Sequence, residues 1–340
     1  MAHPCATLAR LQRLEHSLLA LRRRLYSHVW PRRLAQSTAK PELSREHIDG
    51  MLRHNEISRL IKQGAVYGFE TNQLASNTPC EDHLAVSRSA QPGSYLFGVF
   101  DGHGGGQCAH AVARRLFKYA TIALYPELAR QLLSMQSSYG DQSAQRCGDV
   151  SGVLCFPANS APRHRLVEWL ASSVETESAL DPELASDLQR FLDYYLSQIV
   201  SHELTPSIRE AIRAAFLALD EDLCFHALPD SRGHLVPENV QRVLSGSCAC
   251  VAAVDGPHLH IANLGDSAAV LGVCSEDGVW SARMLTCPHT AENAEEVFRI
   301  KSEHPPQEES QILMAGRLLG MLHPLRAFGD VRWVSARGVQ

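Results

Sequence analysis

Apolar positions recur along the chain with two periods, one of about 3.6 residues and one of about two, which are typical of helices and strands respectively. Segments with the helical period carry an apolar stripe and a polar opposite face. We expect the first of these helices to pack as an entry segment and the second to end near Tyr125-Pro126. The expected helices span 43–65, 109–125, 164–178, 183–203, 207–228 and 291–303.

Segments with the strand period fall into two groups along the chain. The expected strands span 83–89, 95–100, 247–254, 258–263, 268–273 and 279–285. The first two are joined by the turn Gln91–Ser94, which predicts a hairpin. The last four are separated by Asp255-Gly256 and Glu276–Gly278 and predict an antiparallel meander. Residues 69–79 and 134–162 show no period and predict loops, the second as an insertion.

The first 40 residues differ from the rest of the chain in charge. They carry eight Arg or Lys residues and one acid, and leucines recur at steps of three and four from Leu8 to Leu25. An Arg-rich, acid-poor amphipathic segment is typical of a mitochondrial transit peptide, although a surface helix or a basic arm would have the same composition. We therefore divide the chain after residue 40 and expect the folded domain to begin there.

Composition excludes several classes of protein. The 340 residues are 45% hydrophobic and 20% charged, which indicates a soluble chain with a large core and no transmembrane span. The net charge of -5 argues against nucleic-acid binding. The ten cysteines contain no Cys-x-x-Cys pair, which favours a reducing compartment. Cys248 and Cys250 share one face of an expected strand, where we expect them to pack rather than bind metal.

The candidate chemistry lies at one end of the first hairpin. Asp101-Gly102-His103 follows one strand and Glu81-Asp82 precedes its partner, so an antiparallel pair brings the two groups together. Such an oxygen-rich cluster suits Mg²⁺ or Mn²⁺ and could hold two ions that activate a water molecule. His103 could then protonate a leaving oxygen. A turn whose glycines serve geometry alone remains an equal alternative from these residues.

Motifs in a fixed order decide between these alternatives. The chain resembles the PPM-type, or protein phosphatase 2C, family of metal-dependent serine/threonine phosphatases, and within it the pyruvate dehydrogenase phosphatase branch. The motifs that carry the resemblance are Glu81-Asp82, Tyr95–Gly105, Ser245–Val251, Ala262–Ser267 and Arg326–Asp330.

The resemblance implies an α+β fold, an α-β-β-α sandwich of two antiparallel sheets flanked by helices. It implies that Asp101 bridges two Mg²⁺ or Mn²⁺ ions, that the Gly102 carbonyl binds one, and that Glu81 and Asp82 complete the metal site. His103 would be the general acid. Asn77 stands where many members carry a phosphate-binding Arg, which implies a weak contact with substrate phosphate. For Asp266 we favour a structural role in its turn.

The family's later Asp-Gly strand motif and terminal Asp-Asn pair have no counterpart in this chain. We therefore expect a partial phosphatase domain over 41–333, incomplete at its C-terminal end, and a tail at 334–340 outside the family pattern. The resemblance implies dephosphorylation of pyruvate dehydrogenase and its complex in the mitochondrial matrix. The alternatives are a non-catalytic protein of this fold that binds the complex without turnover, and a hydrolase of small phosphate esters.

Overall fold

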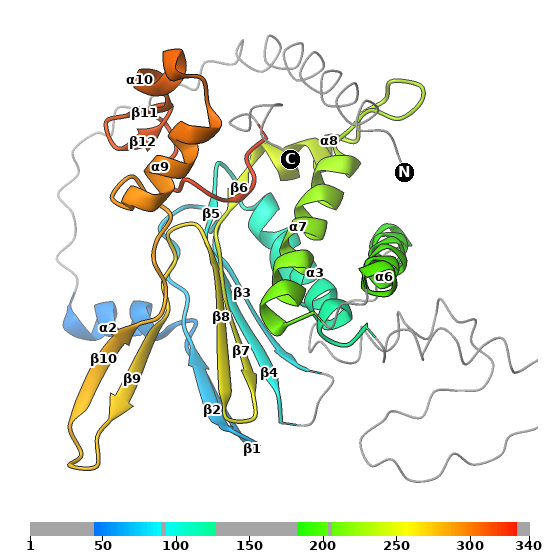
Figure 1. Ribbon diagram of the computed structural model, residues 1–340. Helices are drawn as coiled ribbons and strands as arrows, with labels where there is room; N and C mark the ends of the chain where they lie inside the picture. Colours follow the sequence, from blue (N-terminus) through cyan, green and yellow to red (C-terminus); the bar gives the residue numbers. More distant parts are fainter. Residues whose placement is uncertain (1–43, 90–92, 127–181, 203–205, 332–340) are drawn as a thin grey trace, which may run out of the picture.

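A computed structural model describes residues 44–89, 93–126, 182–202 and 206–331 (Figure 1). The expected transit segment, the insertion at 134–162, the helix at 164–178 and the tail at 334–340 lie outside the described residues. Within the described ranges, no helix has both the length and the apolar character needed to cross a bilayer.

A four-stranded antiparallel sheet of order β3-β4-β7-β8 forms the centre of the fold. Its strands are β3 (His83–Arg88), β4 (Tyr95–Phe100), β7 (Ala249–Asp255) and β8 (His258–Leu264). The expected first hairpin is confirmed, with His83 opposite Phe100 and Arg88 opposite Tyr95. All four strands lie within two residues of their predicted bounds.

Helices cover one face of this sheet (Figure 1). They are α3 (Gln107–Leu124), α6 (Pro182–His202), α7 (Ile208–His226) and α8 (Pro237–Leu244). Phe100 of the sheet packs against Phe117 of α3, and both belong to the main core together with Leu219 of α7. A capping box at Ser207 and Glu210 fixes the start of α7. The short helix α8 was not predicted, although Pro237 in its first turn is a start signal.

A second, small sheet lies beyond the end of β4. It has the order β13-β6-β5 and is built from β5 (Gly102–His103), β6 (Gly246–Ser247) and β13 (Phe328–Gly329). The three strands come from distant parts of the chain. They bring the glycine-rich turn, the segment before β7 and the Arg326–Asp330 motif to one point.

The prediction of one helix over 43–65 is wrong. Helix α2 (Arg45–Arg53) ends early, and β1 (Ile57–Gln63) then pairs with β2 (Val66–Thr71), so part of the expected loop at 69–79 is also strand. The apolar residues of 57–61 satisfy either period, and pairing with β2 decides between them. The expected packing of the first helix is likewise wrong, because α2 contains no buried residue.

The expected meander is divided into two hairpins. Strands β9 (Val270–Cys274) and β10 (Trp280–Met284) pair with each other, whereas β8 pairs with β7. The chain leaves the central sheet at Gly265, whose φ of 99° suits glycine. Phe69 of β2 makes an edge-to-face contact with Phe97 of β4, with 5.6 Å between the ring centroids. The hairpin of β1 and β2 therefore packs on the central sheet. The α+β class with antiparallel sheets is confirmed.

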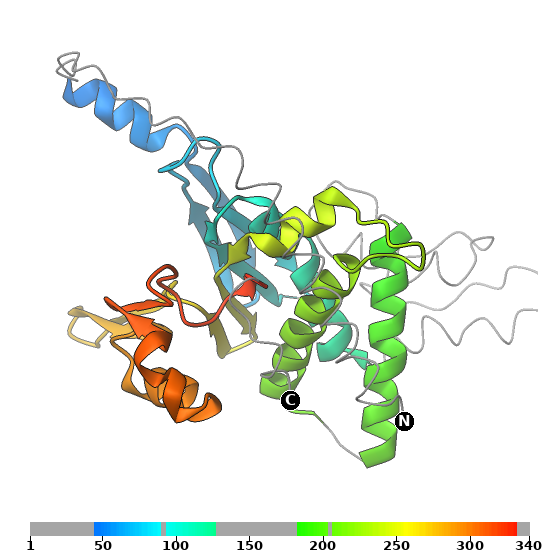
Figure 2. The ribbon, with the colours of Figure 1, turned by 90° about the horizontal axis from the view of Figure 1, so that it is seen from above.

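Residues 287–325 form a small lobe with its own core of Ile300, Ile312 and Leu325. The lobe contains α9 (Ala294–Glu303), the 3-10 helix η1 (Pro306–Glu308), α10 (Glu309–Ile312), β11 (Leu313–Met314) and β12 (Arg317–Leu318). Figure 2 shows the lobe and the helices α6 and α7 on opposite sides of the central sheet.

Asp220 of α7 fastens the helical layer to the small sheet. Its carboxyl group accepts a hydrogen bond of 3.0 Å from the backbone N–H of Gly329. Burial raises the pKa of Asp220 to about 6, the hydrogen bond opposes this rise, and the charges of Asp330 and Glu221 add to it. Because the folded-state pKa lies above that of the unfolded chain, this group stabilises the fold below about pH 4, and the contribution is lost as the pH rises through about 6.

We expect Asp220→Asn to remove this dependence. The difference in free energy of unfolding between wild type and variant should then change by about 2 kcal/mol between about pH 4.5 and about pH 7, in favour of the variant at the higher pH. Urea titrations across this range measure it. Asp193→Asn on the exposed face of α6 is the control. Parallel pH profiles for wild type and Asp220→Asn would contradict the prediction.

Candidate functional site

The carboxyl groups of Asp82 and Asp266 lie close enough to Asp101 for their charges to act on it at the end of the central sheet, and we call the three residues the acidic cluster. The pairing of His83 with Phe100 places Asp82 opposite Asp101. Asp266 arrives from the loop after β8. Partial burial raises the pKa of Asp101, and the charges of Asp82 and Asp266 and a hydrogen bond with Asp82 raise it further, against the opposing effect of His103.

Glu81 and Gly102 are also brought together at this point. A Cβ atom at position 102 would overlap the carbonyl oxygen of Glu81, so only glycine allows the two backbones to lie this close. The side chain of Glu81 accepts a hydrogen bond of 2.8 Å from the amide of Asn77. The three residues predicted from the sequence are therefore neighbours of the acidic cluster, and the metal and phosphate roles assigned to them stay predictions.

His103 forms a pair with Asp330, which sequence reasoning did not place in the site. The His103 Nε2 and Asp330 Oδ2 atoms lie 2.5 Å apart, although 227 residues separate them in sequence. His103 pairs opposite Gly246 on one side of β6, and Gly329 pairs opposite Gly246 on the other. A Cβ at Gly246 would overlap both His103 Nε2 and Asp330 Oδ2. The signal that could have found Asp330 is its motif, Arg326–Asp330.

The surroundings of His103 favour its protonated form. Burial lowers its pKa, but the hydrogen bond and charge of Asp330, together with the charges of Asp101 and Asp266, outweigh burial and raise the pKa overall. The side chain of Asp330 is only 6% exposed, whereas that of His103 is 24% exposed. An imidazolium held by a buried carboxylate and still partly exposed could donate a proton.

The Asp266 carboxylate accepts hydrogen bonds from two further segments. Cys248 Sγ donates to Oδ1 at 3.1 Å, and His323 Nδ1 lies 2.8 Å from Oδ2. Burial raises the pKa of Asp266, but the contacts with His323 and Cys248 outweigh it and lower the pKa overall. Cys248 is buried, in agreement with the predicted packing, and its thiol also contacts Asp266, which the strand position does not predict. The structural role predicted for Asp266 stays a prediction.

The acidic cluster fits a divalent cation. Carboxylate and carbonyl oxygens are the ligands that Mg²⁺ and Mn²⁺ prefer. Burial and the charges of Asp82 and Asp266 raise the pKa of Asp101, and a cation beside these carboxylates would offset both effects. Asp82, Asp101, the Gly102 carbonyl and Glu81 are the groups that could hold it.

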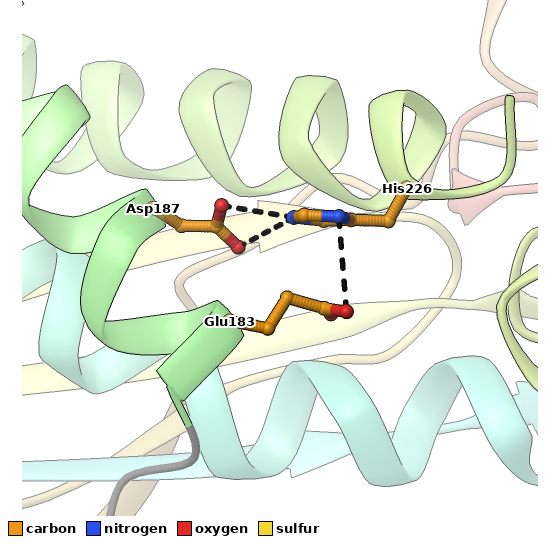
Figure 3. Close-up of side chains that lie close together, drawn as sticks. All are labelled: Glu183, Asp187 and His226. Carbon is orange, nitrogen blue, oxygen red and sulfur yellow. Dashed lines mark hydrogen bonds and ion pairs between the residues drawn. The ribbon is translucent and has the colours of Figure 1, made fainter. Parts of the chain in front are cut away.

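A second cluster of potential metal ligands lies in the helical layer (Figure 3). Glu183 and Asp187 stand one turn apart on α6, His226 ends α7, and one ligand atom from each lies within 4.8 Å of the others. His226 Nε2 lies 2.8 Å from both oxygens of Asp187. His226 Nδ1 lies 3.8 Å from Glu183 Oε2.

Guanidinium groups already occupy the surroundings of this second cluster. Arg115 of α3 lies 3.2 Å from Glu183, and Arg242 of α8 lies 3.7 Å from it. Arg190 contacts Asp187 at 2.7 Å and also reaches Asp222 of α7. Three positive groups oppose a further cation. We therefore interpret the cluster as a charge-compensated network that joins α3, α6, α7 and α8.

We expect Gly246→Ala to separate His103 from Asp330, because the new methyl group overlaps both side chains. The proton NMR spectrum should lose a downfield imidazole N–H signal of His103, and the overpacked site should cost about 1–3 kcal/mol of unfolding free energy. Gly50→Ala is the matched control, since nothing lies within 4 Å of a Cβ there. An unchanged imidazole signal in Gly246→Ala would show that the pair does not depend on this glycine.

We expect Asp187→Asn to destabilise the helical layer by about 3–5 kcal/mol, because His226 and Arg190 lose a charged partner whose side chain is only 1% exposed. Urea unfolding measures this change, with Asp193→Asn on the same helix as the control. Stabilisation by Zn²⁺ that wild type shows and Asp187→Asn lacks would instead identify a metal site.

Comparison with known proteins agrees with the ordered motifs. The family model described as protein phosphatase 2C matches residues 184–339. The chain is 36% identical over 299 residues to pyruvate dehydrogenase (acetyl-transferring) phosphatase 2, mitochondrial, of Homo sapiens, which covers 86% of this chain and 52% of that protein. It is 35% identical over 315 residues to the corresponding phosphatase 1 of Bos taurus, which covers 91% of this chain and 55% of that protein.

A solved serine-threonine phosphatase 2C from Toxoplasma gondii aligns with 84% of this chain and 75% of its own, at 15% identity and a TM-score of 0.40. The chain spans about half the length of the curated relatives it matches. The resemblance drawn from the sequence motifs is confirmed by the family model and by these relatives, and the chain belongs to the protein phosphatase 2C family.

Proposed function

We propose that this chain is a metal-dependent protein serine/threonine phosphatase that dephosphorylates pyruvate dehydrogenase and its complex in the mitochondrial matrix. The observation that carries the proposal is the acidic cluster beside the His103–Asp330 pair, which combines a place for a cation with a proton donor. The names of the relatives, which are mitochondrial pyruvate dehydrogenase phosphatases, support the substrate and the compartment.

In the proposed mechanism, different residues of the site bind the metal ions and the substrate phosphate. Asp82, Asp101, Glu81 and the Gly102 carbonyl would hold Mg²⁺ or Mn²⁺. When bound, such ions lower the pKa of a coordinated water and neutralise phosphoryl oxygens. The Asn77 amide has two N–H groups, and since one donates to Glu81, the other is left for a phosphate oxygen.

His103 acts on the leaving group. Its Nε2–H is engaged by Asp330, so Nδ1 is the ring nitrogen left to protonate the serine or threonine oxygen as the phosphoester bond breaks. Asp330 holds the ring in one orientation and stabilises the imidazolium before the transfer. The exposed side of the ring admits a protein substrate.

We expect the chain to release phosphate from phosphorylated pyruvate dehydrogenase in the presence of Mg²⁺. Asp101→Asn should lower the rate by more than about 100-fold, because even the loss of a group behind a metal ligand costs 10–100-fold. Phosphate release measured over time tests this expectation. No release above the Asp101→Asn control would defeat the proposed activity.

A leaving-group comparison tests the role of His103. His103→Asn should slow hydrolysis of a phosphoserine substrate more than that of p-nitrophenyl phosphate, whose leaving group needs no proton. Hydrolysis of the small ester alone would favour the small-ester hydrolase. Binding to the pyruvate dehydrogenase complex without phosphate release would favour the non-catalytic alternative.

A further inference from the structure

The lobe of residues 287–325 touches the loop that carries Asp266. His289 N donates to the carbonyl of Gly265 at 2.9 Å, and the N–H of Gly265 donates to His289 Nδ1 at 3.1 Å. Leu325 N donates to the carbonyl of His289 at 2.7 Å. The backbone two residues after His323 is thus linked through His289 to the loop that carries Asp266.

His323 itself contacts the cluster. Its Nδ1 atom lies 2.8 Å from Asp266 Oδ2, while Cys248 holds the other oxygen from the opposite side. The His323 side chain is 44% exposed and that of Asp266 is 26% exposed, so the pair lies at the mouth of the site. Two donors from two separate segments set the direction of this carboxylate.

That direction matters because the charge of Asp266 acts within the site. It contributes to the raised pKa values of both Asp101 and His103. Each oxygen of Asp266 accepts one hydrogen bond and keeps a further lone-pair site. A carboxylate free to rotate would spread this negative charge over a larger volume and direct less of it toward a cation.

We propose that His323 is a positioning residue that holds the Asp266 carboxylate toward a divalent cation in the acidic cluster. The inference rests on the proposed function, since the cation belongs to it. Groups that orient a carboxylate behind a metal site raise metal affinity by 10–100-fold in other proteins. His323 would act through Asp266, without touching substrate.

Other contacts keep the lobe attached when His323 is removed. Arg326 makes a bidentate contact with Glu296 of α9, at 2.7 Å and 2.5 Å. The core of Ile300, Ile312 and Leu325 and the backbone bonds of His289 do not involve the imidazole of His323. A substitution at His323 therefore separates positioning from folding.

The test is a titration of the full chain with Mn²⁺, with free Mn²⁺ followed by electron paramagnetic resonance. We expect His323→Ala to weaken Mn²⁺ binding by about tenfold. His323→Asn should restore most of the affinity, because its amide N–H takes the place of Nδ1–H. His304→Ala is the matched control, since His304 contacts Glu308 at 3.2 Å in the same lobe.

Unchanged Mn²⁺ affinity in a His323→Ala variant with a wild-type unfolding temperature would overturn the inference. An equal loss in His304→Ala would overturn it too, by showing a general effect of the lobe. Weaker binding in His323→Ala with no phosphate release from wild type would support the inference and defeat the proposed activity. A wild-type chain that binds no Mn²⁺ would overturn both.

Discussion

The close approach of three chain segments at the small sheet is the constraint on which the site depends. At Gly246 there is no room for a Cβ between His103 and Asp330, and at Gly102 there is none beside the Glu81 carbonyl. Glycine at these two positions allows backbones from distant parts of the chain to meet. The central sheet fixes the position of the carboxylates, because the pairing of β3 with β4 places Asp82 opposite Asp101.

Two polar clusters of this molecule differ in whether nearby positive charges compensate their carboxylates. That difference separates a structural network from a candidate cation site. In the network of Glu183, Asp187 and His226, three arginines compensate the carboxylates, and the group ties four helices together. In the acidic cluster, burial and the charges of Asp82 and Asp266 raise the pKa of Asp101. Ligand spacing alone would have chosen the network of Glu183, Asp187 and His226. The neighbouring charges favour the acidic cluster as the place for a cation.

The lobe of residues 287–325 contacts the acidic cluster from outside the central sheet. It meets the acidic cluster through the loop of Gly265 and Asp266 and through the side chain of His323. The helical layer meets the same region from the other side of the sheet, through Asp220 and the backbone of Gly329. The geometry of the site thus depends on the lobe and on the helical layer, which lie on opposite faces of the central sheet (Figure 2). These two parts contribute few of the proposed metal-binding and catalytic residues.

The sequence by itself determined the first hairpin, the strands β7 and β8, the helices α6 and α7, and the meeting of Asp82 with Asp101. These follow from local periodicity and from the pairing of adjacent strands. Only the tertiary structure decided that residues 57–63 form a strand and that β9 leaves the sheet of β8. It also decided that Asp330 meets His103. Each of these depends on a partner distant in sequence or on a change of sheet, and local periodicity carries no information about either.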